Sequence, residues 1–216
     1  MSEHSHSHSH SHGHEAHNHS HSPPPEDTFG SQSLYAHILH DQIWTLNESV
    51  PNSGRDVVKP WDDRFDTTKI LESDADEQLI MYIPFTGVVK LFSISIRSSL
   101  DSDDAPQTIK LFKNRTDVDF SIASELKPDA TITHSSSSGD IIEYPLKRAI
   151  FSSMKSLTIF VEDNYGDDVT RIEYIGLKGE CKPLAKEPVI TLYEAAANPK
   201  DHKNLVGQER FVPEFN

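Results

Sequence analysis

The chain has 216 residues and a formal net charge of −14, which suits one acidic domain with a tail. This negative charge repels phosphates, so neither nucleic acid nor an anionic membrane is an expected partner. It favours a basic protein partner, and the alternative is that the charge only keeps the protein soluble. The lone Cys181 rules out an internal disulfide, and no apolar run approaches the roughly 18 residues of a membrane span, so we expect a protein of the cytosol or the nucleus.

Residues 1–22 are almost entirely histidine and serine, with no large apolar side chain after Met1. Such a segment has nothing to bury, so residues 1–30 are expected to form a disordered tail that ends in a stiff spacer at Pro23–Pro25. Neutral imidazoles bind transition metals, so adventitious Zn²⁺ or Ni²⁺ is the one metal expected, and no cofactor is. An unselected low-complexity tail is the alternative. The tail histidines are His4, His6, His8, His10, His12, His14, His17, His19 and His21.

Order is expected to begin near Ser31. Leu34 and Ile38 have helical spacing, and residues 43–46 form a short apolar run that predicts a strand. The polar segment at residues 59–64 has a large aromatic, Trp61, in its middle. Trp61 is either an exposed binding aromatic or a side chain that pins this loop to the body of the domain.

Four carboxylates, Glu72, Asp74, Asp76 and Glu77, precede the most apolar stretch of the chain. Oxygen ligands at this density can hold Ca²⁺, but the glycine of an EF-hand loop is missing. The run can also pair with basic groups on a protein partner. The alternative is that these carboxylates cap turns and solubilise the loop.

The stretch Asp74–Arg97 is expected to organise the domain. Two strand-like runs, residues 79–85 and 88–97, flank Thr86-Gly87, and this arrangement predicts a β-hairpin. Pro84 cannot donate a hydrogen bond to a strand ladder, so it is expected at the end of the first strand.

The two runs differ in their apolar pattern. Residues 79–83 show no alternation, so they are expected to be covered on both faces. Phe92, Ile94 and Ile96 alternate with polar residues, so the second run is expected to be buried on one face only, with these three side chains inward.

The rest of the chain reads as short strands separated by turns, with almost no amphipathic helix. Near Gly176 the apolar phase of the last strand shifts, which predicts a bulge. Residues 117–123 and 193–197 are expected to form single helical turns. This pattern predicts an all-β antiparallel sandwich or jelly roll. The further strands are expected at residues 108–114, 130–134, 141–146, 157–162 and 170–178.

No known catalytic motif occurs in the chain. G-x-S-x-G, the P-loop, H-E-x-x-H and G-x-G-x-x-G are all missing from the sequence. Cys181 has no base beside it in the sequence, so a reactive thiolate is not expected. The sequence therefore favours a binding protein rather than an enzyme.

Several motifs, in order, resemble the PITH domain, whose name stands for proteasome-interacting thioredoxin. The similarity runs from about Ser31 to about His202 and implies a PITH domain at residues 31–203, followed by a loose tail at 204–216. The motifs are LNES at 46–49, KPWDDR at 59–64, ESDADEQL at 72–79, IPFTG at 83–87, VKL at 89–91, KLFKN at 110–114, YIGLKGE at 174–180 and YEAAANP at 193–199.

This resemblance implies a fold like galactose-binding-like β-jelly rolls and a docking role on the 26S proteasome. The best-known relatives carry a thioredoxin domain ahead of the PITH domain, but this sequence contains none, so redox activity is not implied. We expect a non-enzymatic adaptor that binds the proteasome or another large assembly through Glu72, Asp74, Asp76 and Glu77. A glycan- or small-ligand-binding jelly roll is the alternative, with Trp61 as its first candidate contact.

Overall fold

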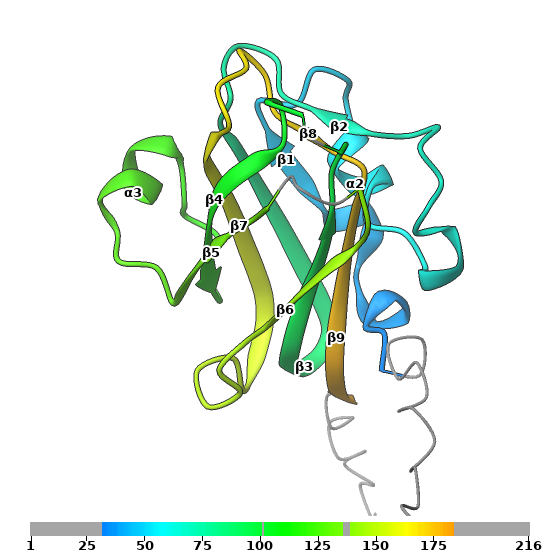
Figure 1. Cartoon of the computed structure of the whole chain (residues 1–216). Coiled ribbons are helices and arrows are strands. Elements are labelled where there is room, and N and C mark those ends of the chain that lie inside the picture. Colours follow the sequence, from blue (N-terminus) through cyan, green and yellow to red (C-terminus); the bar gives the residue numbers. More distant parts are fainter. Residues whose placement is uncertain (1–31, 101, 136–138, 184–216) are drawn as a thin grey trace, which may run out of the picture. The chain divides into compact units, whose positions relative to one another are not determined.

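A computed structural model describes residues 32–100, 102–135 and 139–183. These residues form an antiparallel β-sandwich (Figure 1). The histidine tail, the helical turn expected at 193–197 and the loose tail expected at 204–216 lie outside these residues. The strands are β1 Trp44–Leu46, β2 Leu71–Glu72, β3 Leu79–Arg97, β4 Pro106–Lys113, β5 Ala130–Thr133, β6 Ile142–Pro145, β7 Met154–Asn164, β8 Arg171–Ile172 and β9 Tyr174–Pro183.

The helical elements are short and lie in connections, which agrees with the all-β prediction. The helix α2, Ser53–Asp56, packs closely on β1: a Cβ on Gly54 would lie 1.9 Å from Thr45 Oγ1. The elements are η1 Tyr35–His37, η2 His40–Gln42, α2 Ser53–Asp56, η3 Trp61–Asp63 and α3 Phe120–Glu125.

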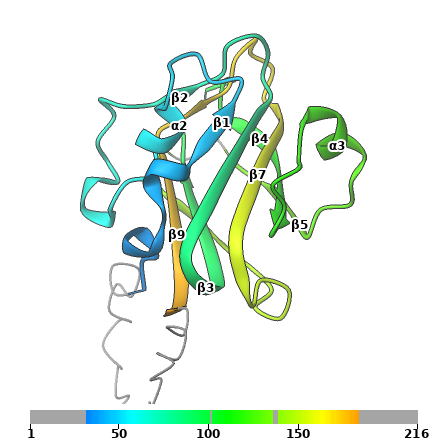
Figure 2. The ribbon, with the colours of Figure 1, turned by 180° about the vertical axis from the view of Figure 1, so that it is seen from behind.

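β3 is one continuous strand of 19 residues, so the predicted hairpin is wrong. Its first half pairs with β1 and β7, in a sheet of order β1-β3-β7-β4-β5, and its second half pairs with β6 and β9. The two halves do not pair with each other. Figures 1 and 2 show them as two limbs that meet at one end of the domain, so β3 contributes to both layers of the sandwich.

Backbone geometry explains why Thr86-Gly87 is not a turn. A two-residue hairpin turn needs positive φ, and among the described glycines only Gly166 has it. Gly87 is extended and pairs with Pro183 of β9. A Cβ there would lie 2.5 Å from the carbonyl oxygen of Lys182, so this glycine permits the close approach of β9 rather than a reversal of the chain.

Pro84 also differs from expectation, because it lies inside β3 and not at a strand end. Its carbonyl oxygen accepts a hydrogen bond from Leu39 N at 2.9 Å. This bond lies on the edge of β3 that β1 occupies, but past Tyr82, where the pairing with β1 ends. The N–H and C=O of one strand residue point the same way. The nitrogen of Pro84, which carries no hydrogen, therefore points towards an irregular segment, where no strand ladder needs a donor.

A bulge at Phe92 changes the inward face of the second half of β3. Leu91 pairs with Gly179 and Ser93 with Lys178, so two successive residues of β9 face three of β3. Leu91 takes the inward place with Ile94 and Ile96, while Phe92 lies outside the main core with the Arg148 guanidinium 4.1 Å from its ring centroid. The prediction that Phe92 shares their face is wrong.

Burial of this half on one face only was also a wrong expectation. Ser93 and Ser95 are as buried as Ile94 between them, and β6 and β9 flank the strand on its two edges. The outer face of the first half is covered as predicted. Ile80 joins Phe160 of β7 and Ala123 of α3 in a second apolar cluster, whereas its neighbours in sequence face the main core.

The phase shift near the last strand comes from a break and not from a bulge at Gly176. β8 pairs with β2 and ends at Ile172, and β9 begins at Tyr174 beside β3. Gly176 lies under the Tyr174 ring, since a Cβ there would approach the phenol oxygen to 2.3 Å. The register of β9 is regular at this point, and its partner β3 carries the bulge.

Candidate functional site

The acidic run lies in the connection between β2 and β3, and Asn47 holds this connection in place. Asn47 Nδ2 donates to Asp76 Oδ1 at 2.8 Å and to the carbonyl oxygen of Gln78 at 2.7 Å. Asn47 Oδ1 accepts from Ala75 N at 3.0 Å. Asp76 Oδ1 also accepts from Gln78 N at 3.0 Å, so this carboxylate closes its own turn. Asp76 therefore has the turn-capping role that the sequence offered as an alternative.

Glu72 is paired within the domain. Its Oε2 accepts from Arg171 Nε at 2.5 Å, and Arg171 Nη1 donates to Asp104 Oδ2 at 2.7 Å. These two hydrogen bonds raise the pKa of Arg171. Because one guanidinium bridges two carboxylates, Glu72 and Asp104 have an internal cationic partner, in contrast to Asp74, which has no side-chain bond among the described residues.

Hydrogen bonds join four connections at this end of the sandwich. Thr170 donates from its N to Ser73 Oγ at 2.8 Å and from its Oγ1 to the carbonyl oxygen of Glu77 at 2.7 Å. Tyr165 N donates to the carbonyl oxygen of Asp103 at 3.1 Å. Together with the Asn47 bonds, these contacts tie residues 47–52, 73–78, 102–105 and 164–170 into one surface.

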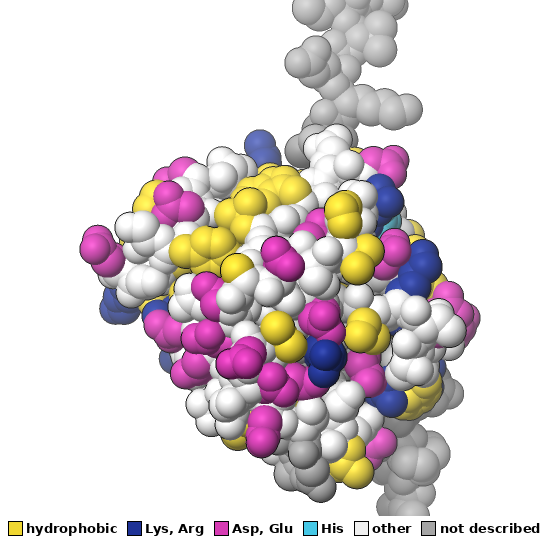
Figure 3. Space-filling model, turned by 90° about the horizontal axis from the view of Figure 1, so that it is seen from above, with side chains coloured by type: hydrophobic (Ala, Val, Ile, Leu, Met, Phe, Trp, Pro, Cys, Tyr) yellow, Lys and Arg dark blue, Asp and Glu magenta, His cyan; other side chains and the backbone are white. Residues whose placement is uncertain are grey.

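We call this surface the acidic apex and define it by its exposed carboxylates, Asp74, Asp76, Asp103, Asp167 and Asp168. Two exposed apolar side chains belong to the same connections, Val50 at 62% and Tyr165 at 36% exposure. Figure 3 views the domain from this end and shows acidic and apolar side chains interspersed, with few basic ones. Protein interfaces combine an apolar core with a polar rim, and this surface contains both kinds of side chain.

Trp61 does not join the acidic apex. It is half-buried in η3, with the Arg64 guanidinium 4.1 Å from its ring centroid, and Arg64 Nη1 donates to the Trp61 carbonyl oxygen at 2.8 Å. Arg64 also lies over the ring of exposed Phe65, at 4.7 Å. The Trp61 ring thus stacks on Arg64 within its own loop, and both interpretations of Trp61 stay predictions.

Lys59 anchors the same loop, and its place in the KPWDDR motif is the one feature of the sequence that points to it. Only 7% exposed, its ammonium donates to the carbonyl oxygens of Lys69 at 2.9 Å, Glu173 at 3.0 Å and Asp66 at 2.5 Å. Burial lowers its pKa. Three carbonyl bonds use all three ammonium protons, so Lys59 fastens both ends of residues 59–69 to the start of β9.

A buried histidine is the second group that sequence analysis missed. His134 is 1% exposed, with Nε2 2.9 Å from Ser98 Oγ and Nδ1 2.8 Å from the Tyr144 hydroxyl. Burial lowers its pKa to about 4, so the imidazole is neutral at pH 7. Although a hydroxyl beside an imidazole resembles a nucleophile with its base, Ser98 is itself 1% exposed and no substrate reaches it.

The described part of the chain contains no cluster of three or more His, Cys, Asp or Glu side chains that could hold a metal ion. The acidic run, considered from the sequence as a Ca²⁺ site, is among these described residues and gives no such cluster. His37 and His40 are three residues apart in the sequence, and His40 Nε2 lies 2.9 Å from the carbonyl oxygen of Tyr35. No helix within the described residues is long and apolar enough to cross a membrane.

Solved structures with a similar fold are carbohydrate-binding-module domains. The CBM32-1 and CBM32-2 domains of Clostridium perfringens ZmpB align over 71% of this chain and 38% of theirs, with a TM-score of 0.52 and 13% identity. A structure of the same domains in complex with GalNAc has a TM-score of 0.51 at 11% identity, over 72% of this chain and 37% of that one. At this identity the likeness shows the jelly-roll fold alone.

Sequence comparison identifies much closer relatives. A PITH domain-containing protein of Schizosaccharomyces pombe is 40% identical over 190 residues, covering 87% of this chain and 91% of that protein. Human PITH domain-containing protein 1 is 41% identical over 192 residues, covering 88% and 90%. The PITH domain itself matches residues 24–197. The chain therefore belongs to the PITH domain family.

Proposed function

We propose that this chain is a non-enzymatic docking module that binds the 26S proteasome, or a related large assembly, through the acidic apex. Family membership supports a PITH-domain role, and the name of the family points to the proteasome. The observation that carries the choice of surface is the joining of four connections into one apex, which carries exposed carboxylates together with exposed Val50 and Tyr165.

The apex suits docking because its shape is fixed before a partner arrives. Asn47, Ser73 and Thr170 bind the connections to one another, so little loop ordering is left to oppose association. The exposed carboxylates attract a basic surface, which speeds association and fixes orientation more than it strengthens the final complex. Binding is therefore expected to weaken as salt rises, mainly through slower association.

The test reverses charges that the fold does not use. Asp74→Lys with Asp168→Lys changes two exposed carboxylates that have no side-chain hydrogen bond within the described residues, whereas Asp76 is left intact because it closes a turn. Asp62→Lys with Glu125→Lys, at exposed positions of η3 and α3, is the matched control with the same change in net charge.

Binding to purified 26S proteasome is measured by biolayer interferometry at low and physiological salt. The apex variant is expected to associate at least tenfold more slowly, with a melting temperature within about 2 °C of the parent protein, while the control variant binds like the parent. Equal loss in both variants would mean that total charge and not the apex matters. If the parent binds the proteasome and the apex variant binds equally well, the proposed surface is wrong.

A further inference from the structure

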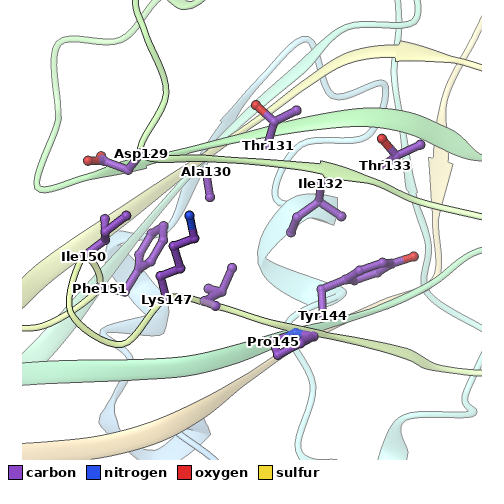
Figure 4. A pocket seen from close by; sticks show the side chains of 11 residues that line it. Asp129, Ala130, Thr131, Ile132, Thr133, Tyr144, Pro145, Lys147, Ile150 and Phe151 are labelled. Carbon is purple, nitrogen blue, oxygen red and sulfur yellow. The ribbon is translucent and has the colours of Figure 1, made fainter.

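A cavity of about 390 Å³ lies between β5 and β6 (Figure 4). Its walls are largely apolar. Ile132 and Phe151 belong to the main core, and Leu146 and Ile150 pack against it from the cavity side. An apolar hollow at the margin of a sandwich can take an apolar side chain from another molecule.

β5 presents an unpaired edge beside this cavity. It is the last strand of its sheet and pairs only with β4, with Thr133 opposite Thr108. His134 N donates to the Gln107 carbonyl oxygen at 2.8 Å, so the backbone groups of His134 and Ile132 face β4. The N–H and C=O groups of the alternate residues, Thr131 and Thr133, therefore point away from β4. Both threonines are exposed.

β6, across the cavity, has a blunted edge. Leu146 N donates to the Phe92 carbonyl oxygen at 2.8 Å, so Leu146 and Tyr144 face β3 with their backbone groups. Pro145 and Glu143 face away, and Pro145 has no N–H to offer. A proline on an outer strand discourages pairing with another chain. Of the two strands beside the cavity, only β5 is thus able to accept a further strand.

A cation lies at the mouth of the cavity. Lys147 is exposed and makes no ion pair with any described residue. Figure 4 shows its side chain extending over the cavity towards Ala130. Asp129 also lines the cavity, but its carboxylate accepts a hydrogen bond from Lys113 N at 2.7 Å and points outward in the same view. The charge available to a bound group is therefore that of Lys147.

We propose that β5 and this cavity bind an extended peptide segment of a partner protein. The peptide adds as a strand beside β5, through the free backbone groups of Thr131 and Thr133, and directs one apolar side chain into the cavity. A carboxylate of the peptide pairs with Lys147. Strand addition gives affinity through main-chain hydrogen bonds, and the cavity and the lysine give preference for sequence. This site does not depend on the docking role of the acidic apex.

The first test selects ligands from a phage-displayed library of random octapeptides, with the full chain as bait. Enriched peptides are expected to carry an apolar residue two positions from an acidic one and no proline between them. The best peptide, labelled with fluorescein, is then titrated by fluorescence anisotropy against variants. Thr131→Pro removes one edge N–H, and binding is expected to weaken about five- to tenfold, whereas the control Thr131→Ala keeps the N–H and the affinity.

Lys147→Gln is expected to weaken the selected peptide about fivefold, and to leave the affinity of the same peptide with its acidic residue changed to the amide unaltered. In the unaltered protein, saturating peptide should slow hydrogen exchange of the Thr131 or Thr133 amide. This second measurement needs no variant to fold. The proposal is overturned by a library that yields no enriched sequence, by equal binding of Thr131→Pro, or by unchanged exchange at both amides.

Discussion

Acidification from pH 7 to pH 5 is expected to destabilise the domain through one buried side chain, His134. In the folded state its imidazole is neutral, since both ring nitrogens lie within 2.9 Å of the Ser98 and Tyr144 hydroxyls and burial lowers its pKa to about 4. In the unfolded chain the same imidazole takes up a proton near its ordinary pKa of about 6.5. Between these two values the unfolded state binds more protons, so stability is full above pH ~6.5 and falls as pH drops towards 4.

The magnitude follows from the two pKa values. Each pH unit inside this window removes about 1.4 kcal/mol, so the full effect is about 3 kcal/mol and the part lost by pH 5 is about 2 kcal/mol. A domain with 5 to 15 kcal/mol of stability feels a loss of that size. The tail histidines fall outside the described residues. They contribute equally to the pH dependence of the parent and of the His134 variant, so their contribution cancels when the two proteins are compared.

The assay is urea unfolding, followed by tryptophan fluorescence, at pH 7 and pH 5, for the parent and for His134→Gln. Glutamine offers an amide to the two hydroxyls and does not titrate. The variant is expected to be less stable at pH 7 but to lose about 2 kcal/mol less than the parent on acidification. Carboxylates contribute equally to both proteins. An identical pH dependence in parent and variant would show that His134 is not the group responsible.

Three further outcomes are expected. Leu91→Asp should prevent folding, because it buries a charge in the main core. Phe92→Asp should fold with a lowered melting temperature, because Arg148 lies beside that position. Equal loss of stability in the two variants, measured by thermal melts, would contradict the bulge. Lys59→Met should leave three carbonyl oxygens without their donor and speed proteolysis within residues 60–69, with Lys69→Met, an exposed position, as control. The histidine tail should bind Ni²⁺ or Zn²⁺ at pH 7 and release the metal near pH 5. Titration calorimetry compares the full chain with residues 31–216, and equal heats of binding for the two would disprove this expectation.

Local patterns in the sequence predicted the strands well, and they predicted the path of the chain between strands less well. The alternation of Leu157, Ile159 and Val161 places these side chains in the main core, as the structure confirms. A glycine between two apolar runs has two uses, however, and sequence alone does not separate them. In one the chain reverses, and in the other, realised at Gly87, an extended backbone lets a neighbouring strand come close.

The candidate sites were harder to predict because their residues are brought together from distant parts of the chain. The acidic run was visible in the sequence, but Glu72 pairs with Arg171, which comes 99 residues later in the chain, and Asp76 is bound by Asn47, which comes 29 residues earlier. Neither pairing has a local signal. His134 likewise acquires its neighbours only when β5, β6 and the end of β3 meet, so nothing about its sequence position distinguishes it from an exposed histidine.

Because β3 belongs to both layers of the sandwich, the domain cannot complete its fold until its last strand, β9, has been synthesised. During synthesis residues 79–97 emerge well before β7 and β9, yet Leu79 pairs with Val161 and Arg97 with Tyr174. Neither layer can close around β3 until those later strands leave the ribosome. The most apolar segment of the chain therefore remains without these two partner strands at the stage when nascent chains aggregate most readily. A domain built this way is expected to fold late and all at once, and to draw on chaperones until β9 is in place.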